Sequence, residues 1–286
     1  MTAYRPRWRS LLYVPAVSEK FVAKAHERGA DAIILDLEDA VAPSEKRMAR
    51  ELVPAAAKTV SRGGADVLVR VNRPWRLAVR DLEAAIGPDV CALVLPKVDS
   101  AEHVLALAEI ATSVEDERGL PVGHTLFFAR VEGPKGLLNA AAIAAAHPRV
   151  VAIGLGSSDY TISTGMEAGG PGNAMASFLV VNAAKAAGIA AIGLTGVIVG
   201  YRDLEAFRRS AEESRAMGFR GAPCVHPTQV PILNEVFSSG PEELEWARRV
   251  VEAYEQALAA GQGAITVDGE FVDVPYYEQA KRLLAE

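Results

Sequence analysis

The sequence predicts an α/β fold, specifically a (β/α)8 barrel of the TIM type with a C-terminal helical extension. Eight short apolar segments alternate with segments of helical spacing between residues 10 and 227. Several of the apolar segments are continuous rather than alternating, which is typical of parallel strands buried on both faces. Each strand–helix unit takes about thirty residues, the length of a strand with its crossover helix. An open, doubly wound parallel sheet is the alternative that the same pattern allows.

The expected strands are short runs of aliphatic and aromatic residues, and a helical segment follows nearly every one. We expect the strands at residues 10–16, 31–39, 66–72, 91–98, 125–133, 149–159, 190–197 and 221–227. We expect the helices between them at residues 18–30, 44–64, 76–87, 100–119, 136–147, 173–188 and 203–218. Because strand and helix alternate, consecutive strands should lie parallel, with right-handed crossovers.

The pattern changes after the eighth strand, so we divide the chain into a barrel domain, 1–240, and an extension, 241–286. The extension begins with a long amphipathic helix at 241–261, continues with a loop at 262–275 and ends in a short helix at 276–286. It adds no further strand–helix unit. We therefore expect it to pack on its own barrel or to contact a neighbouring subunit.

Composition argues against several classes of protein. Of the 286 residues 50% are hydrophobic, which is enough to form a buried core, so we do not expect disorder. No apolar run reaches the roughly 20 residues that cross a bilayer, so we expect no membrane span. With 30 Lys and Arg against 36 Asp and Glu the net charge is −6, which argues against a nucleic-acid surface. Cys91 and Cys224 lack the spacing of a disulfide framework and favour a cytoplasmic location.

Ionisable and polar side chains gather at the ends of the expected strands. Because parallel strands share one carboxyl edge, where barrel enzymes place their reacting groups, these residues should lie together. They are Asp36, Glu38, Asp39, Arg70, Asn72, Lys97, Arg130, Glu132, Asp159 and His226. The opposite ends of the strands carry no such concentration, so we interpret this edge as a functional site.

Glu132 and Asp159 follow consecutive strands and are the candidate metal ligands. Two carboxylates without a nearby His or Cys suit Mg²⁺, which binds one or two protein carboxylates together with water and substrate oxygens. Two structural alternatives stay open. Each carboxylate can pair with a neighbouring cation such as Arg130 or Lys97, or Asp159 can cap the helix that follows it.

Arg70 stands between valines at the end of a strand, so it points into the barrel mouth or joins a buried ion pair. It can bind a carboxylate or stabilise an oxyanion, or it can form a structural bridge to Asp36 or Glu38. His226 precedes a proline, where a hydrogen bond that fixes the turn is the expected role. The segment GLGSSD, 154–159, lacks the third glycine of a dinucleotide-binding loop, so we expect no nicotinamide cofactor.

Several of these segments carry the motifs of a known family. They are RSLLYVPA, ADAIILDLEDAVAPSEK, VLVRVN, LVLPKV, VEGPKGLLN, GLGSSD, GFRGAPCVHPTQVPILNEVFSSGPEELEWARRV and GQGAITVDGEFVDVP. In this register, from about residue 9 to 285, the chain resembles the citrate lyase β-subunit-like proteins of the HpcH/HpaI aldolase/citrate lyase group. It is similar to malyl-CoA and citramalyl-CoA lyases.

The resemblance implies a Mg²⁺-assisted barrel that commonly assembles as a homotrimer. Its motifs match Glu132 and Asp159 to the metal-binding carboxylates, and Arg70 to the arginine that contacts the keto-acid part of the substrate. The implied reaction is C–C cleavage of a 3-hydroxyacyl-CoA of the malyl-, β-methylmalyl- or citramalyl-CoA type to an acyl-CoA and a 2-keto acid. The alternatives are a malyl-CoA thioesterase, a malate-synthase-like condensation, and a citrate lyase β subunit acting on a carrier-protein thioester.

The resemblance implies further roles for acidic and basic residues. The acidic cluster that holds metal waters and the arginine is matched by Asp36, Glu38 and Asp39. A carboxylate that the family's tail presents to a neighbouring subunit's site, as the proposed acid or base, is matched by Asp273. The CoA nucleotide needs cations at the barrel mouth, and the candidates are Lys20, Lys24 and Arg9. An ordinary solvated helix face is the alternative for these cations.

The chain departs from the family's usual motifs around the site. Arg130-Val131-Glu132-Gly133 stands where the family has a proline two residues before a Glu-Thr pair, and Leu155 replaces a phenylalanine. We therefore expect the acyl group or its carrier to differ from those of the best-known members. Arg130 places a cation beside the expected metal, and we expect it to bind an additional substrate carboxylate.

Overall fold

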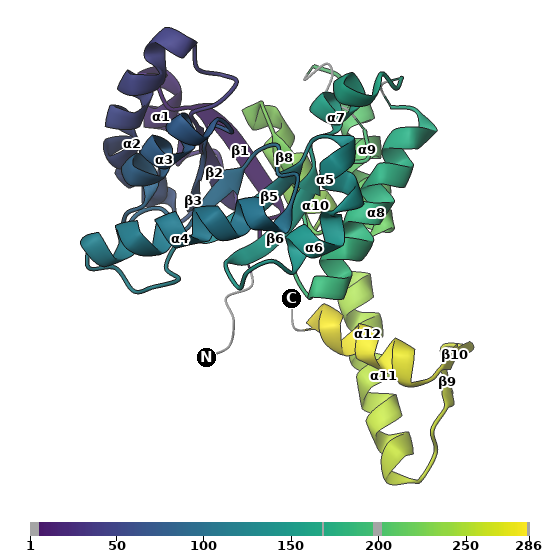
Figure 1. Ribbon diagram of the computed structural model, residues 1–286. Coiled ribbons are helices and arrows are strands. Elements are labelled where there is room, and N and C mark those ends of the chain that lie inside the picture. The colour runs from purple at the N-terminus through teal and green to yellow at the C-terminus, as the bar shows by residue number, and fades with distance from the viewer. Residues whose placement is uncertain (1–5, 168, 197–201, 285–286) are drawn as a thin grey trace. The chain divides into compact units, whose positions relative to one another are not determined.

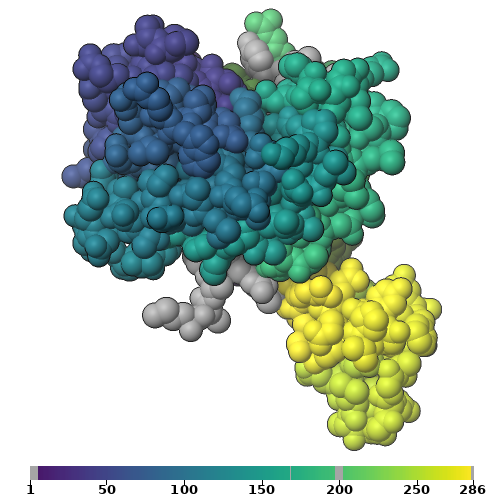
Figure 2. Space-filling model, in the orientation of Figure 1, coloured from purple at the N-terminus to yellow at the C-terminus, as the bar shows by residue number. Residues whose placement is uncertain are grey.

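The computed structural model describes residues 6–167, 169–196 and 202–284. Contacts between residues divide the chain into two compact units, Met1–Phe237 and Ser238–Glu286. The first unit is an α/β fold and the second consists of two helices and a hairpin (Figure 1). In Figure 2 the atoms of the second unit, coloured yellow-green to yellow, form a compact body of their own.

The first unit contains a strand at each of the eight expected positions, and together these strands form one parallel sheet. Their order is β7-β6-β5-β4-β3-β2-β1-β8. This order follows the sequence without the reversal that defines a doubly wound sheet, so that alternative is wrong. The strands are β1 (Ser10–Pro15), β2 (Ala32–Asp36), β3 (Asp66–Arg70), β4 (Ala92–Leu95), β5 (Leu126–Val131), β6 (Val150–Leu155), β7 (Ala190–Ala191) and β8 (Ala222–Cys224).

The two edge strands of this sheet meet at a single point. Strand β7 has only two residues, and the end of the strand expected at 190–197 lies outside the described residues. One isolated parallel bridge, between Ile192 and Gly221, joins the edges next to β7 and β8. The structure therefore shows a curled, eight-stranded parallel sheet of the kind the barrel prediction requires, without a continuous ladder that closes it.

Helices lie along the outside of the curled sheet (Figure 1). They are α1 (Glu19–Ala25), α2 (Lys46–Val60), α3 (Trp75–Ala85), α4 (Ala101–Glu117), α5 (Pro134–Leu138), α6 (Ala140–Ala144), α7 (Ser157–Thr164), α8 (Pro171–Ala187), α9 (Leu204–Met217) and α10 (Val230–Val236). Short 3-10 turns occupy Pro43–Glu45, Ser61–Gly63 and Pro227–Gln229. Within the described part of the chain, every helix is too short or too polar to span a bilayer.

Two apolar cores cover the two faces of the strands. Because side chains alternate along a strand, each strand contributes to both cores. The outer core, between sheet and helices, includes Ile33, Leu35 and Phe127. The inner core, enclosed by the curl of the sheet, is built from Trp8, Leu11, Ala32, Ile34, Leu68, Ala92, Val94, Phe128, Ala152 and Ile192. This packed interior supports the side chains at the strand ends.

The second unit corrects the loop expected at 262–275. It begins with α11 (Pro241–Ala259), continues with an antiparallel hairpin of β9 (Ile265–Val267) and β10 (Glu270–Val272), and ends with α12 (Val274–Leu284). Asp268 and Gly269 connect the strands with φ angles of 53° and 86°. A two-residue Asp-Gly turn with positive φ at both positions matches the twist of a hairpin, and this signal was overlooked in the sequence.

Candidate active site

The carboxyl ends of β2, β3 and β5 bring three of the expected charged residues onto one face. Asp36 pairs in register with Arg70, and Arg130 pairs with Gly154. All three charged residues share the face of their strands that lines the inner core, since they alternate with outward-facing neighbours. The strand ends therefore form a charged layer above the apolar interior, as the sequence predicts.

Arg70 forms a buried ion pair with Asp36 and Glu38, which is the structural alternative that the sequence left open beside a role in substrate binding. Its Nε donates to Asp36 Oδ1 (2.7 Å), its Nη2 to Asp36 Oδ2 (2.6 Å) and its Nη1 to Asp39 Oδ2 (3.1 Å). Nη1 also lies 2.9 Å from Glu38 Oε2. Burial lowers the pKa of Arg70, but Asp36 and the other neighbouring charges outweigh this and raise it above its ordinary value. Three of the five N–H groups of a guanidinium are therefore committed within the protein.

Asp36 holds this arginine in a fixed orientation. The residue is 1% exposed, and its carboxylate also accepts hydrogen bonds from the backbone N–H groups of Glu38 (2.9 Å) and Ala40 (3.2 Å). The chain after β2 thus turns around the carboxylate, as short acidic side chains commonly promote. The turn places Glu38 and Asp39 around the same guanidinium, so the acidic cluster expected from the sequence exists as a group of contacts.

Lys97, one of the expected edge residues, links this cluster to the candidate metal ligand Glu132, with which the sequence analysis had named it as a possible ion-pair partner. Its Nζ lies 2.5 Å from Glu38 Oε1 and 3.9 Å from Glu132 Oε2. Burial raises the pKa of Glu38, although Arg70 and Lys97 oppose the shift. Lys97 has a φ of 51°, a left-handed conformation that is costly for a residue with a side chain and is concentrated at functional sites. No sequence signal indicates this backbone geometry.

Tyr13 is a member of the site that sequence reasoning missed. The Cζ of Arg70 lies 4.8 Å from the centroid of the Tyr13 ring, in a cation–π contact. Burial raises the pKa of Tyr13, while the charges of Arg130 and Arg70 oppose the shift. Alternation along β1 places Leu11 in the inner core and Tyr13 two residues closer to the carboxyl edge, so this periodicity could have identified it.

Glu132 is buried with one carboxylate oxygen free. The residue is 6% exposed, and its Oε2 has no hydrogen-bond partner among the described residues. Its nearest cations, Lys97 and Arg130, lie 3.9 Å from its oxygens, beyond hydrogen-bond distance. Burial raises the pKa of Glu132 to about 7, with Glu38 and Asp159 adding to the shift and Arg130 and Lys97 opposing it. This carboxylate is therefore poorly neutralised by the protein itself.

Asp159 lies in the first turn of α7 rather than at the end of β6. The helix begins after Gly156, and no side-chain hydrogen bond caps it, so the capping alternative finds no support. Gly156 also adjoins the other candidate ligand, because a Cβ at this position would lie 2.4 Å from Glu132 Cγ. The absence of a side chain at Gly156 thus provides the space that Glu132 occupies.

The residues present fit a hard divalent cation. Asp36, Glu38, Asp39, Glu132 and Asp159 provide five carboxylates, whereas Arg70, Lys97 and Arg130 provide three cations, so the layer has an excess of negative charge. Among the described residues, no three His, Cys, Asp or Glu side chains lie close enough together to form a metal site by themselves. Mg²⁺ takes one or two protein carboxylates and completes its shell with water and substrate oxygens, and Glu132 and Asp159 are the two carboxylates expected for it.

The expected CoA cations are not all near this edge. Arg9 directly precedes β1 and donates to Asp31 through Nε (2.8 Å) and Nη2 (2.7 Å). It therefore lies at the amino-terminal ends of the strands, opposite the acidic cluster, and the expectation that it lines the mouth is wrong. Lys20 and Lys24 are exposed on α1. Lys20, in the first turn after β1, is the nearer of the two to the carboxyl edge.

Two further expected residues have defined local contacts. His226 Nδ1 lies 2.7 Å from Thr228 Oγ1, which agrees with the role of fixing the turn before Pro227. Asp273 belongs to the second unit, where it directly precedes α12 and accepts a backbone hydrogen bond from Tyr277. Its Oδ1 is buried without a hydrogen-bond partner in the described part of the chain. The contact of Asp273 with a neighbouring subunit stays a prediction.

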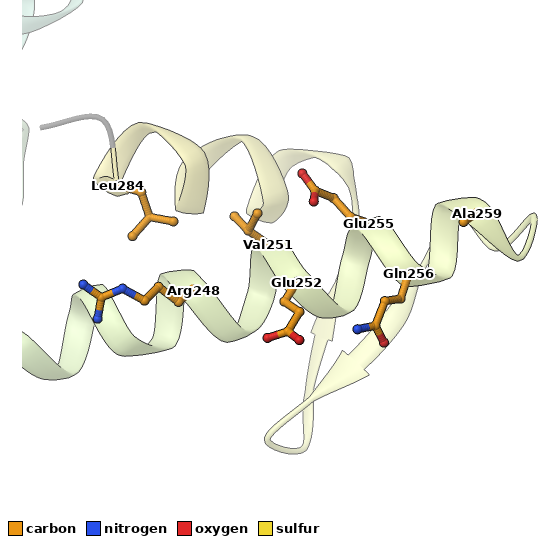
Figure 3. A pocket seen from close by; sticks show the side chains of 7 residues that line it. All are labelled: Arg248, Val251, Glu252, Glu255, Gln256, Ala259 and Leu284. Atoms are coloured by element: carbon orange, nitrogen blue, oxygen red, sulfur yellow. The ribbon is translucent and has the colours of Figure 1, made fainter.

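The second unit carries a shallow groove of its own. It has a volume of about 540 Å³ and lies along α11 near the end of α12 (Figure 3). Its lining consists of Arg248, Val251, Glu252, Glu255, Gln256, Ala259 and Leu284. None of these is an expected site residue, so the groove does not alter the assignment.

Comparison with known proteins identifies the family. The model of the HpcH/HpaI aldolase/citrate lyase family matches residues 9–227. The chain is 38% identical over 284 residues to a (3S)-malyl-CoA thioesterase of Cereibacter sphaeroides, covering 98% of this chain and 94% of the relative. It is 34% identical over 279 residues to citrate lyase subunit beta of Leuconostoc mesenteroides, covering 96% and 92%.

A solved structure of a related protein covers the whole chain. Protein CitE from Mycobacterium tuberculosis, in complex with magnesium, acetoacetate and coenzyme A, aligns with a TM-score of 0.76 and 29% sequence identity. The alignment covers 100% of this chain and 98% of the other. With its parallel sheet, its acidic edge and these relatives, the chain belongs to the HpcH/HpaI aldolase/citrate lyase family.

Proposed function

We propose that this protein is a Mg²⁺-dependent lyase that cleaves a 3-hydroxyacyl-CoA of the malyl-, β-methylmalyl- or citramalyl-CoA type. The products are an acyl-CoA and a 2-keto acid. The observation that carries the proposal is the buried, unpartnered Oε2 of Glu132 at an edge where carboxylates outnumber cations. A solved relative that binds magnesium, acetoacetate and coenzyme A supports it.

Glu132 and Asp159 are the residues that would hold the metal. A bound Mg²⁺ would act as a Lewis acid toward the hydroxyl and carboxylate oxygens of the substrate. Arg70 has two N–H groups that donate to neither Asp36 nor Asp39. One is on Nη1, which is also ion-paired with Glu38 Oε2 at 2.9 Å, and the other, on Nη2, can donate to an oxyanion or a carboxylate. Because Asp36 holds the guanidinium through two hydrogen bonds along one edge, the remaining donor is oriented before substrate binds, which is the condition for efficient electrostatic stabilisation.

Asp273 is the proposed base. Its carboxylate takes the proton of the substrate hydroxyl, and the hydroxyl oxygen becomes the carbonyl oxygen of the keto acid. The electron pair of the breaking C–C bond passes to the carbon next to the thioester, and the protonated Asp273 returns its proton there to give the acyl-CoA. The Oδ1 of Asp273 has no hydrogen-bond partner among the described residues, so no hydrogen bond within the subunit holds its proton-accepting oxygen.

We also propose a homotrimer in which the second unit of one subunit completes the site of another. Exposed apolar side chains on α5, α7 and α8 support association, because soluble monomers rarely present such groups together. They include Leu138 (86% exposed), Ile162 (81%), Met175 (70%) and Phe178 (56%). We place the protein in the cytoplasm, in line with the two free thiols of Cys91 and Cys224, and we propose Lys20 and Lys24 as contacts of the CoA nucleotide.

Product analysis tests the proposed reaction. Malyl-, β-methylmalyl- and citramalyl-CoA are incubated with Mg²⁺, and the products are identified by mass spectrometry, with Glu132→Gln as the control. A keto acid formed in step with an acyl-CoA supports the lyase, whereas conversion by the wild type and by Glu132→Gln at equal rates refutes the metal assignment. Condensation of acetyl-CoA with a keto acid as the only reaction would indicate a synthase. Inertness toward all CoA esters would indicate a carrier-protein substrate.

A second candidate is a (3S)-malyl-CoA thioesterase. The relative with this activity is 38% identical over 98% of the chain. A thioesterase would release free malate and free CoA thiol from the same substrate, without a keto acid, so the product analysis separates it from the lyase.

Complementation tests the shared site. Glu132→Gln and Asp273→Asn variants are each expected to be nearly inactive alone. If one subunit supplies Glu132 and its neighbour supplies Asp273, co-expression of the two variants in equal amounts restores about a quarter of wild-type activity over all randomly assembled trimers. Absence of any recovery in confirmed mixed oligomers would contradict an intersubunit site.

A further inference from the structure

Arg130 is a buried cation whose hydrogen-bonding capacity is largely unused. Its side chain is 12% exposed, and its Nε and Nη1 are buried without a hydrogen-bond partner among the described residues. Its Nη2 donates to the backbone carbonyl of Leu155 (3.3 Å). Because buried polar groups in folded proteins are nearly always hydrogen-bonded, unpaired guanidinium nitrogens indicate acceptors supplied by a ligand.

The surroundings of Arg130 belong to the mouth of the curled sheet. Its Cζ lies 5.6 Å from the centroid of the Phe128 ring, which is part of the inner core. Its register partner on β6 is Gly154, which has no side chain to offer an acceptor. A Cβ at Gly154 would lie 3.1 Å from the Phe128 ring and 2.0 Å from the Ile192 carbonyl oxygen, so this side of Arg130 is bounded by backbone and ring.

The carboxylate that is ion-paired with Arg130 among the described residues does not satisfy its hydrogen-bonding capacity. Arg130 Nε lies 3.9 Å from Glu132 Oε1, which is an ion pair without a hydrogen bond, and Glu132 is the proposed metal ligand. Arg70, in contrast, donates three hydrogen bonds to Asp36 and Asp39. The charge of Arg130 is thus the less fully neutralised of the two, although both side chains reach the same layer.

We propose that Arg130 is a specificity-determining residue that binds a second carboxylate of the substrate. This inference rests on the proposed lyase reaction, in which the first carboxylate belongs to the carbon that bears the hydroxyl. It changes the expected substrate, because malyl-, β-methylmalyl- and citramalyl-CoA each have only that one free carboxylate. The substrate class is then a 3-hydroxyacyl thioester with two free carboxylates, and the acid product is a 2-keto dicarboxylic acid. A carboxylate is the ligand that a planar guanidinium binds through two charge-assisted hydrogen bonds.

Matched ligands that differ by one carboxylate test this subsite. Oxaloacetate is compared with 2-oxobutyrate, and 2-oxoglutarate with 2-oxovalerate; in each pair a methyl group replaces the second carboxylate. Dissociation constants are measured by calorimetry on the full-length protein with Mg²⁺ and CoA. We expect the wild type to bind the dicarboxylate of at least one pair about 10- to 100-fold more tightly, the effect of one charge-assisted hydrogen-bonded pair.

The Arg130→Met variant should lose this preference by weakening the dicarboxylate alone, and Arg130→Lys should retain part of it. The thermal midpoint of Arg130→Met should be unchanged or higher than that of the wild type, because this variant removes a buried charge that the protein does not neutralise. A lowered midpoint with unchanged ligand preference would assign Arg130 a structural role and overturn the proposal. Should Arg130→Met fail to fold, Arg130→Lys carries the same test, since a single ammonium cannot reproduce a two-pronged contact.

The outcomes separate this inference from the proposed function. Equal affinity of the wild type for both members of each pair, together with lyase activity on a CoA ester, would overturn the Arg130 subsite and leave the lyase intact. Failure of every keto acid to bind, together with inertness toward all CoA esters, would overturn the proposed function and the subsite with it.

Discussion

Replacing Gly156 by alanine should displace the Glu132 side chain while leaving its carboxylate chemically unchanged. A Cβ at Gly156 would lie 2.4 Å from Glu132 Cγ, 2.9 Å from Cδ and 3.0 Å from Oε1. Gly156 has a φ of −82°, so alanine meets no left-handed backbone penalty there. The substitution therefore acts through this contact between side chains.

The magnitude follows from the size of the overlap. Non-bonded carbon atoms settle at about 3.5 to 4.0 Å, so the Glu132 side chain must move away by roughly 1 Å or more. Mg²⁺ requires oxygen ligands at about 2.0–2.1 Å in near-octahedral geometry, and a shift of this size removes the carboxylate from the shell. We expect the affinity for Mg²⁺ and kcat/KM to fall by about 100-fold, with a loss of about 1–3 kcal/mol in stability from overpacking.

Gly133→Ala is the matched control. Gly133 directly follows Glu132, has a φ of −154°, and its added Cβ would contact only Ser163 Oγ at 3.9 Å. Binding of Mg²⁺ is measured by calorimetry for both variants, and thermal midpoints are recorded at the same time. If Gly156→Ala binds Mg²⁺ within about threefold of Gly133→Ala while folding normally, Glu132 is not the metal ligand or its position is unimportant.

Three further perturbations have defined outcomes. Arg149→Met should lower the free energy of unfolding by about 3–5 kcal/mol, because it would leave the buried carboxylate of Glu115 without its cation. Glu115 accepts a hydrogen bond from each Nη atom of Arg149 at 2.6 Å. A loss under about 1 kcal/mol in chemical denaturation would contradict this. The pKa of Glu132 is raised to about 7, so without Mg²⁺ its favourable contribution is lost as pH rises through 7. Glu132→Gln should then be more stable than the wild type at pH 8 and similar at pH 5, and equal pH dependence of the two midpoints would disprove the shift. Arg70→Ala should lower kcat by roughly 100- to 1000-fold in steady-state assays, as expected for a lost oxyanion donor, whereas an effect on KM alone would assign Arg70 to substrate binding.

The sequence alone was sufficient to locate the strands and the edge at which the charged residues gather. Strands form at all eight expected positions because continuous apolar runs have to be buried on both faces. The charged residues that follow them meet because parallel strands share one carboxyl edge, and Arg70 duly pairs with Asp36. By the same logic Arg9 could have been excluded, since it precedes its strand and faces Asp31 at the opposite edge.

Other members of the site depend on geometry that no local pattern encodes. Lys97 adopts a φ of 51° and joins Glu38 to Glu132 across two strand ends, contacts that exist only once the sheet has curled. The space for Glu132 depends on Gly156, a residue on the neighbouring strand–helix connection. Such relations join residues far apart in sequence, and periodicity describes only neighbours along one element.

By itself, then, the sequence determined the order of the elements, the edge that carries the charged residues and the family, because these follow from burial periodicity and from motifs of adjacent residues. Only the tertiary structure decided which charges neutralise one another. It showed that Arg70 is held by Asp36 and Asp39, whereas Arg130 and Glu132 each keep buried polar atoms without a hydrogen-bond partner among the described residues. The reason is physical: hydrogen bonds depend on distances of a few tenths of an ångström, which the packing of the whole sheet sets and no single segment contains.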